Sequence, residues 1–257
     1  MRKSPVAALL LACLAFPVPA MAIVNVEQAI IGPGKEGLSS HAELAIDGSS
    51  GNTNKNSIRA ELLSQWLHGP HTEFLWLQYA YGKSNGLVDT NRFFAHLRHR
   101  TMVGEAWGVE AFAQAGRDPF ARLSLRTLLG GGVRWTLLEA AGKAGVYFGL
   151  GAFYEHERLS PKAGTTDPLD SRLWRANSYL VLKRQLNDQI RLYSITYYQP
   201  AFRRMADYRL LEQLAAAIRL YKQLDLKLNL DIAHDSEPPQ GVRKTDVRYS
   251  TGIAVDF

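Results

Sequence analysis

The carboxyl-terminal twelve residues, 246–257, alternate between apolar and polar or small side chains, and this pattern restricts the possible folds more than any other. One set contains Val247, Tyr249, Thr251, Ile253, Val255 and Phe257, and the other contains Asp246, Arg248, Ser250, Gly252, Ala254 and Asp256. Successive side chains of a β-strand point to opposite faces, so the stretch predicts a strand with one apolar and one polar face. It ends on an aromatic residue, which is typical of a strand whose outer face meets lipid.

The rest of the chain repeats this pattern in segments of about a dozen residues, separated by turn residues. Bacterial barrels have an even number of strands. We therefore predict an all-β fold, a transmembrane antiparallel β-barrel of about 12 strands in which 246–257 pairs with 39–50 to close the wall. The predicted strands cover residues 39–50, 55–67, 72–83, 91–102, 106–117, 120–137, 143–157, 172–186, 189–200, 207–221, 223–235 and 246–257.

The predicted connections alternate between short turns and longer polar loops. Outer-membrane barrels have short periplasmic turns and longer extracellular loops, so the alternation supports a barrel with both ends in the periplasm. Residues 51–54 form the one short outer connection in this prediction, and the longer outer loops cover 82–90, 160–171, 200–206 and 236–245. Aromatic residues fall near the segment ends, where they predict two interfacial girdles.

Strand parity assigns the side chains to two faces. In 223–235 the leucines face lipid and the charged residues face the interior, and 120–137 and 172–186 divide in the same way. Two features interrupt the pattern. Glu212 falls on the lipid face, for which we predict a β-bulge that shifts the register. Gly130, Gly131 and Gly132 lie inside a strand and predict a bulge, a bend or close approach by another group.

The amino terminus predicts export. Arg2 and Lys3 precede an apolar run that ends in Pro17, Pro19 and the small-residue site 20–22, so residues 1–22 read as a cleaved signal peptide. An alternative is lipidation at Cys13, which is preceded by a lipoprotein-like sequence. Residues 23–37 are then a periplasmic lead-in, and residues 38–257 form the barrel.

Charge and cysteine content exclude several classes of protein. The formal net charge of +6 falls by two, to +4, when Arg2 and Lys3 are removed, and acids and bases are closely mixed, so nucleic acid is not an expected partner. Cys13 is the only cysteine, which leaves the mature chain without a disulfide or a cysteine metal site. No later apolar run is long enough for a helical span, so strands must cross the membrane.

Several segments in order resemble the YdiY-type family of salt-induced outer-membrane proteins, which is built on a domain of unknown function. They are 50–53, 82–86, 97–99, 110–114, 122–134 and 150–155, and the resemblance covers most of residues 38–257. It implies a barrel in the outer membrane of a Gram-negative cell and a role in salt or envelope stress, and it supplies no catalytic residues. The terminal Phe257 also resembles the signal that barrel assembly machinery reads, which makes that machinery an expected partner beside outer-membrane lipid.

The predicted interior carries many ionisable side chains. They either line a selective pore, because rings of charge tune which ions pass, or pair with one another and fill a narrow lumen. A barrel of this strand number is smaller than the 16–18-stranded porins, which favours a narrow or partly plugged interior. The set is Glu61, Arg98, Arg100, Glu110, Arg126, Arg134, Glu155, Arg175, Lys183, Lys227 and Asp231.

An enzyme is the main alternative to a structural or narrow-channel barrel. His234 and Ser236 share the lipid face of one strand end, and this His-x-Ser spacing resembles the catalytic pair of outer-membrane phospholipase A, although Glu237 follows where that family continues with Asn-Gly. No third residue is evident to orient His234. The protein is therefore predicted not to be an enzyme, and a lipid hydrolase is kept as the alternative.

Other functions have less support. His68 and His71 flank a turn, and His96 and His99 differ in strand parity, so neither pair predicts a metal site. No catalytic, cofactor or metal residues are assigned, and no cofactor is predicted. A soluble periplasmic β-protein that binds a ligand is a third possibility. The barrel is expected to be a monomer.

Overall fold

The computed structural model describes residues 36–52, 54–140, 143–222 and 224–255, and these form one antiparallel sheet of 12 strands in chain order. The strands are β1 (Gly37–Ser49), β2 (Lys55–His68), β3 (His71–Ser84), β4 (Leu87–Met102), β5 (Trp107–Asp118), β6 (Leu123–Ala140), β7 (Ala144–Leu159), β8 (Asp170–Gln185), β9 (Ile190–Ala201), β10 (Arg204–Tyr221), β11 (Leu224–Asp235) and β12 (Thr245–Val255). A single 3₁₀ turn, η1 (Pro119–Ala121), lies between β5 and β6.

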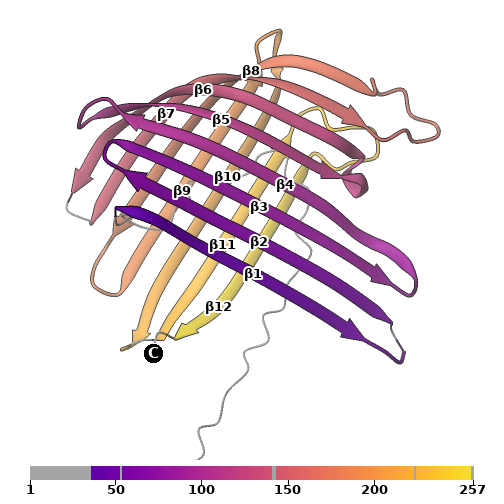
Figure 1. Cartoon of the computed structure of the whole chain (residues 1–257), viewed down its shortest axis with the longest axis horizontal. Coiled ribbons are helices and arrows are strands. Elements are labelled where there is room, and N and C mark those ends of the chain that lie inside the picture. Colours follow the sequence, from indigo (N-terminus) through magenta and orange to yellow (C-terminus); the bar gives the residue numbers. More distant parts are fainter. Residues whose placement is uncertain (1–35, 53, 141–142, 223, 256–257) are drawn as a thin grey trace, which may run out of the picture.

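The predicted all-β fold is confirmed, and each of the twelve predicted segments overlaps one strand. In Figure 1 the sheet bends so far that the indigo and magenta strands β1–β4 cross the orange and yellow strands β9–β12. No helix of the described residues is long and apolar enough to span a membrane. The architecture is that of a barrel wall.

The predicted closure differs from the structure. The ladders of the described residues run from β1 to β12, and the expected pairing of 246–257 with 39–50 is not among them, so β1 and β12 are the edges of the sheet. Phe257 lies outside the described residues.

Two of the predicted long outer loops are tight turns. Asn85 and Gly86 join β3 to β4, with positive φ angles of 49° and 83°, which is the conformation that a two-residue hairpin requires. Only two residues, 202–203, separate β9 from β10, and the irregularity falls within β10, where the register shifts between Arg204 and Tyr208. Residues 160–169 and 236–244 are the long connections, and both lie at the end of the sheet that the prediction places outside.

The predicted faces of the strands are confirmed. In β6, Arg126 and Arg134 are buried on the concave face, while Leu129 is 68% exposed on the convex face. In β8, Arg175 and Asn177 are buried, whereas Trp174 and Leu180 are exposed. The exposed apolar side chains therefore form the surface that would meet lipid.

The glycines of 130–132 allow close approach, as one of the predicted alternatives required. A Cβ on Gly130 would lie 2.5 Å from the Cβ of Phe153 and 2.8 Å from Cζ of Phe112, so the missing side chain makes room for two interior rings. A Cβ on Gly132 would lie 2.5 Å from the carbonyl oxygen of Leu150 on β7. The three residues pair continuously with β5 and β7, and no bulge interrupts them.

Glu212 stays on the lipid face, so the predicted bulge is wrong. It pairs in regular register with Thr196 on β9 and Ile232 on β11. The hydroxyl of Ser194 donates to Glu212 Oε1 at 2.9 Å, and the hydroxyl of Thr196 donates to Oε2. These two outward-facing hydroxyls satisfy the carboxyl group in place, which removes the need for a register shift.

Replacing Glu212 with Gln should stabilise the protein by about 1 kcal/mol, because a charge near the middle of the lipid face is unfavourable. Glu212 lies four residues from Tyr208 and nine from Tyr221 along β10, well inside an apolar band about 25 Å tall. The amide oxygen of Gln still accepts a hydrogen bond from one hydroxyl. Urea unfolding in lipid measures the difference, with Glu139→Gln at an exposed strand end as the control. A clear loss of stability would contradict the lipid-facing assignment.

Candidate functional site

The interior face holds the eleven ionisable residues predicted from strand parity, and most of them are paired. Arg98, Glu110, Arg126, Arg134, Glu155 and Arg175 are buried, and Glu61 and Asp231 bond to glutamine or arginine side chains of neighbouring strands. The ammonium group of Lys183 lies over the rings of Tyr147 and Tyr193. Lys227 is exposed on β11. The interior is therefore a set of local ion-pair networks.

The larger network centres on Glu155 of β7, whose side chain is 1% exposed. Arg126 of β6 donates from Nε to Glu155 Oε2 at 2.7 Å, and Arg175 of β8 donates from Nε to Oε1 at 3.2 Å. Arg209 of β10 donates to the same carboxylate across two intervening strands. One buried carboxylate thus joins four strands of the wall.

Further carboxylates surround the three arginines. Arg209 donates from Nη2 to Glu157 Oε2 at 3.0 Å and from Nε to Asp235 Oδ2 at 3.0 Å. Arg175 Nη2 lies 2.9 Å from Asp207 Oδ1. The cluster contains three guanidinium groups and four carboxylates, so it has no excess of positive charge.

The sequence prediction did not include Arg209, Glu157 or Asp235 in the interior set. Strand parity could have placed Arg209 in the interior, because Arg209 lies on the same face of its strand as Gln213 and on the opposite face from Glu212. The contact between Arg209 and Glu155 joins β10 to β7, and it depends on the curvature of the wall. That curvature is not visible in the alternation of a single strand.

A second network centres on Glu110 of β5 and lies nearer the end of the strands that the sequence analysis predicts to be periplasmic. Arg100 donates from Nε to Glu110 Oε1 at 2.5 Å, and the hydroxyl of Tyr179 donates to Oε2 at 2.7 Å. The guanidinium of Arg134 lies 4.4 Å from the ring centroid of Tyr147. Tyr179 belongs to β8, so this network also crosses two strands.

Apolar side chains fill the space beside the two networks. Phe112, Leu128 and Phe153 form one buried cluster. The other is formed by Tyr179, Val181, Ile195, Tyr197 and Leu211. The concave face from β5 to β10 is consequently a packed core.

The concave face is most open at the edge strands β1 and β12, which have no buried side chain among their described residues. Glu43 and Asp47 of β1 and Lys227 of β11 are exposed, although their parity places them inside. Arg59 of β2 donates to Asp47 at 2.8 Å while remaining partly exposed. The open part of the interior therefore lies along the edge strands β1 and β12, with β2 and β11 of intermediate exposure beside them.

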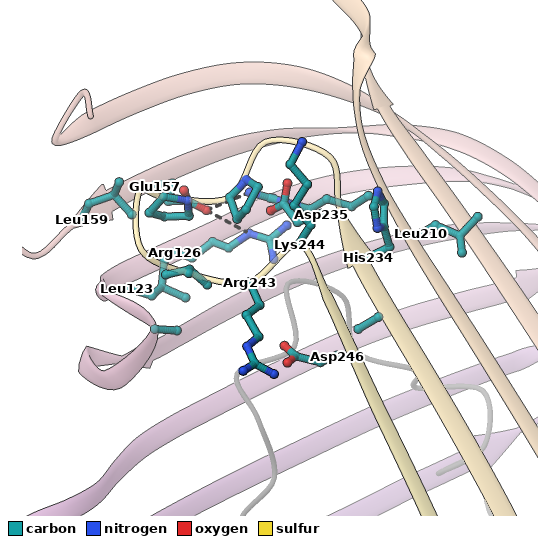
Figure 2. Close-up of a pocket in the computed structure, with 16 residues that line it drawn as sticks. Leu123, Arg126, Glu157, Leu159, Leu210, His234, Asp235, Arg243, Lys244 and Asp246 are labelled. Carbon is teal, nitrogen blue, oxygen red and sulfur yellow. Dashed lines mark hydrogen bonds and ion pairs between the residues drawn. The ribbon is translucent and has the colours of Figure 1, made fainter. Parts of the chain in front are cut away.

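A pocket lies above the Glu155 network, beneath the outer loop 236–244. Arg126, Glu157, Arg209 and Asp235 form its charged floor, and Pro238, Pro239, Val242, Arg243 and Lys244 contribute from the loop. Figure 2 shows this loop arching over Glu157, with Arg243 pointing toward Asp246.

The predicted His-x-Ser pair is not brought together by hydrogen bonds. His234 Nδ1 lies 2.8 Å from Thr245 Oγ1 on β12. The hydroxyl of Ser236 donates to the carbonyl oxygen of Ala206 at 2.9 Å and accepts from the backbone N–H of Tyr208 at 2.8 Å. Ser236 therefore anchors the outer loop to β10, and both its hydrogen-bonding directions are occupied.

Three histidines lie side by side on the convex face near the turn between β2 and β3. The ring centroids of His68 and His71 lie 5.2 Å apart, and those of His71 and His99 lie 5.7 Å apart. His99 Nδ1 lies 2.8 Å from Glu73 Oε1. Within the described part of the chain, no group of three or more such side chains has a geometry that could hold a metal ion. The predicted signal peptide and nearly all of the lead-in lie outside the described residues.

Comparisons with known proteins give one family and several distant structural likenesses. Residues 42–257 match the family model of DUF481, a protein of unknown function. No curated protein matches the chain in sequence.

The structural likenesses are all low in identity. The NanC porin shares 12% identity with a TM-score of 0.47, over 85% of this chain and 99% of the porin. The translocator domain of autotransporter NalP from Neisseria meningitidis shares 14% with a TM-score of 0.48, over 90% of this chain and 92% of that domain. The CymD monoaromatic hydrocarbon channel shares 11% with a TM-score of 0.41, over 93% and 86% of the respective chains.

Proposed function

We propose that this chain, which belongs to the DUF481 family, is a narrow outer-membrane pore whose interior is partly filled by its own ion-pair networks. The membership confirms the resemblance to the YdiY-type family. The observation that carries the proposal is that the burial of concave-face side chains differs between parts of the same sheet. The concave face of β5–β10 is packed, while the edge strands β1 and β12 have no buried side chain among their described residues.

The outer membrane is proposed as the location because the convex face is apolar around its circumference. Leu44, Leu129, Leu214 and Tyr249 are 42–79% exposed on strands from β1 to β12. A soluble protein rarely exposes so large an apolar surface. The proposed protein is a monomer with lipid around it. A role in salt or envelope stress rests on the family resemblance, and induction of expression by salt would test it.

Charge balance predicts weak selectivity between ions. Because the buried arginines are matched by carboxylates, the filled side contributes no strong field of one sign to the open side. Small solutes would pass along β1, β2, β11 and β12. Conductance of the purified protein in planar bilayers tests this function, and silence in a correctly folded sample would overturn it.

Deleting Phe257 should lower the amount of protein in the outer membrane, because we propose that assembly machinery recognises the end of the last strand. The terminal aromatic continues the apolar face that Val247 and Tyr249 begin. Heat-modifiable mobility of membrane fractions measures the assembled protein. Phe257→Tyr, which keeps an aromatic end, is the control, and a normal level of the deletion variant would contradict the proposal.

A further inference from the structure

Arg122 occupies an unusual position at the outer end of the barrel. It caps the 3₁₀ turn η1 with a positive φ of 60°, a backbone conformation that residues other than Gly rarely adopt. Asp118 supports the turn by accepting hydrogen bonds from the backbone N–H groups of Phe120 and Ala121. The side chain of Arg122 is held inward and is 8% exposed.

The guanidinium group of Arg122 joins two outer loops. Its Nη1 donates to Asp167 Oδ2 at 2.5 Å and to the carbonyl oxygen of Gln240 at 2.9 Å. Its Nη2 donates to Thr165 Oγ1 at 3.1 Å. Asp167 and Thr165 belong to the loop 160–169, and Gln240 belongs to the loop 236–244.

The two loops also bond directly to each other. The backbone N–H of Gln240 donates to Asp167 Oδ1 at 3.0 Å, and Gln240 Nε2 donates to Thr166 Oγ1 at 2.9 Å. Asp167 thus accepts from both Arg122 and Gln240, one oxygen for each. The loop 236–244 lies over the pocket above the Glu155 network, so these bonds hold a cover in place.

We infer that Arg122, Asp167 and Gln240 form a latch that holds the loop 236–244 closed over the outer entrance of the pore. Because one arginine bonds to both loops, the two loops should be released together. Breaking the bond to Asp167 or to Gln240 weakens the support of the remaining loop. The inference rests on the proposed pore and concerns its regulation. Open and closed states differ in the position of this loop while the barrel wall remains unchanged.

Single-channel conductance of the full chain in planar bilayers tests the latch. Arg122→Ala should raise the mean conductance or the open fraction at least about threefold, because it removes the bonds to both loops. Arg158→Ala is the matched control. Arg158 is a half-exposed arginine at the outer end of β7 that pairs with Asp170 and contacts neither loop partner of Arg122. It should conduct like the unmodified protein.

Cross-linking gives an independent readout if Arg122→Ala folds poorly. Cys13 is the only natural cysteine and lies in the predicted signal peptide, so Thr166→Cys with Gln240→Cys introduces the two thiols of interest. Joining them with a short thiol cross-linker should lower conductance, and a cleavable linker should restore it on reduction. The single-cysteine variants should not respond.

Acid should release the latch. Asp167 lies in an outer loop, and the hydrogen bond from the backbone N–H of Gln240, followed by that from Arg122, lowers the pKa of its carboxyl group. Because the pKa is lowered, the latch is intact above the ordinary range of an aspartate and is lost only as the pH falls through the lowered value. Conductance should be constant through the neutral and mildly acidic range and rise only when the pH falls below the ordinary range of an aspartate.

The other charged residues of the two loops are Lys162, Glu237, Arg243 and Lys244, of which only Glu237 is also a carboxylic acid. Asp167→Asn therefore isolates the group, and it should be open at neutral pH with little further response to acid. A conducting protein in which Arg122→Ala, Asp167→Asn and the cross-link all leave conductance unchanged would overturn the latch alone. Silence of every folded variant would overturn the pore and the latch together.

Discussion

Replacing Glu155 with Ala is expected to destabilise the protein by about 3–5 kcal/mol, the cost of leaving buried charges without their partner. Glu155 accepts from Arg126, Arg175 and Arg209, and all four side chains are at least nine-tenths buried. Removing the carboxylate leaves three guanidinium groups close together in a region that water hardly reaches. The free energy of urea unfolding in lipid or detergent measures the loss.

Two variants make this result interpretable. Glu155→Gln keeps the volume of the side chain, so it separates loss of charge from creation of a cavity, and it should retain most of the destabilisation. Glu43→Ala removes an exposed glutamate from the concave face of β1, and its effect should stay within about 0.5 kcal/mol. Equal stabilities of Glu155→Ala and Glu43→Ala would show that the Glu155 network is not a buried part of the core.

Gly151→Ala should also destabilise the barrel, by about 1–3 kcal/mol or more, because its added methyl group meets backbone that has little freedom to move. A Cβ on Gly151 of β7 would contact the carbonyl oxygen of Gly131 and lie 2.7 Å from Cα of Gly132 on β6. These strands form part of the packed wall, so the clash separates a pair that supports the Glu155 network.

The control is an identical substitution in an open place. A Cβ added to Gly252 of β12 would have no atom within 4 Å, and the φ angle there is not strained, so Gly252→Ala should change the unfolding free energy by less than about 0.5 kcal/mol. Comparable losses in the two variants would contradict the close packing of β6 against β7. Unfolding midpoints measured side by side in the same lipid decide the question.

The strand pattern was predictable because each strand has its own two faces. The leucines of β11 and the arginines of β6 identified the lipid and interior sides without knowledge of any neighbour. The sequence Asn85-Gly86 is typical of a two-residue hairpin turn and favoured a tight turn at this place. The prediction of a longer loop over 82–90 did not take this into account.

The interior networks depended on contacts between distant strands. Glu155 meets Arg209 only because the wall curves tightly enough to bring β7 near β10. The environment of Glu212 could be predicted only from the register of β9 against β10, which places Ser194 and Thr196 beside its carboxyl group. Arg122 was predicted to face the lumen, but its role between two loops depends on where those loops lie in space.

The edges of the sheet likewise could not be predicted from the pattern of single strands. Alternation in 246–257 predicts a strand with a lipid face, and β12 confirms it as far as Val255. Whether β12 also pairs with β1 depends on the tilt and curvature of the whole wall. The described structure leaves both strands as edges beside the more open part of the interior.

Single-channel conductance of the unmodified protein in planar bilayers tests the central claim most directly. A partly filled barrel of 12 strands should give small, discrete steps with weak ion selectivity, well below those of a 16–18-stranded porin in the same salt. Conductance as large as that of such a porin would show that the Glu155 and Glu110 networks do not fill the interior. Complete silence of the folded protein and of the folded Arg122→Ala variant would show that it is not a pore.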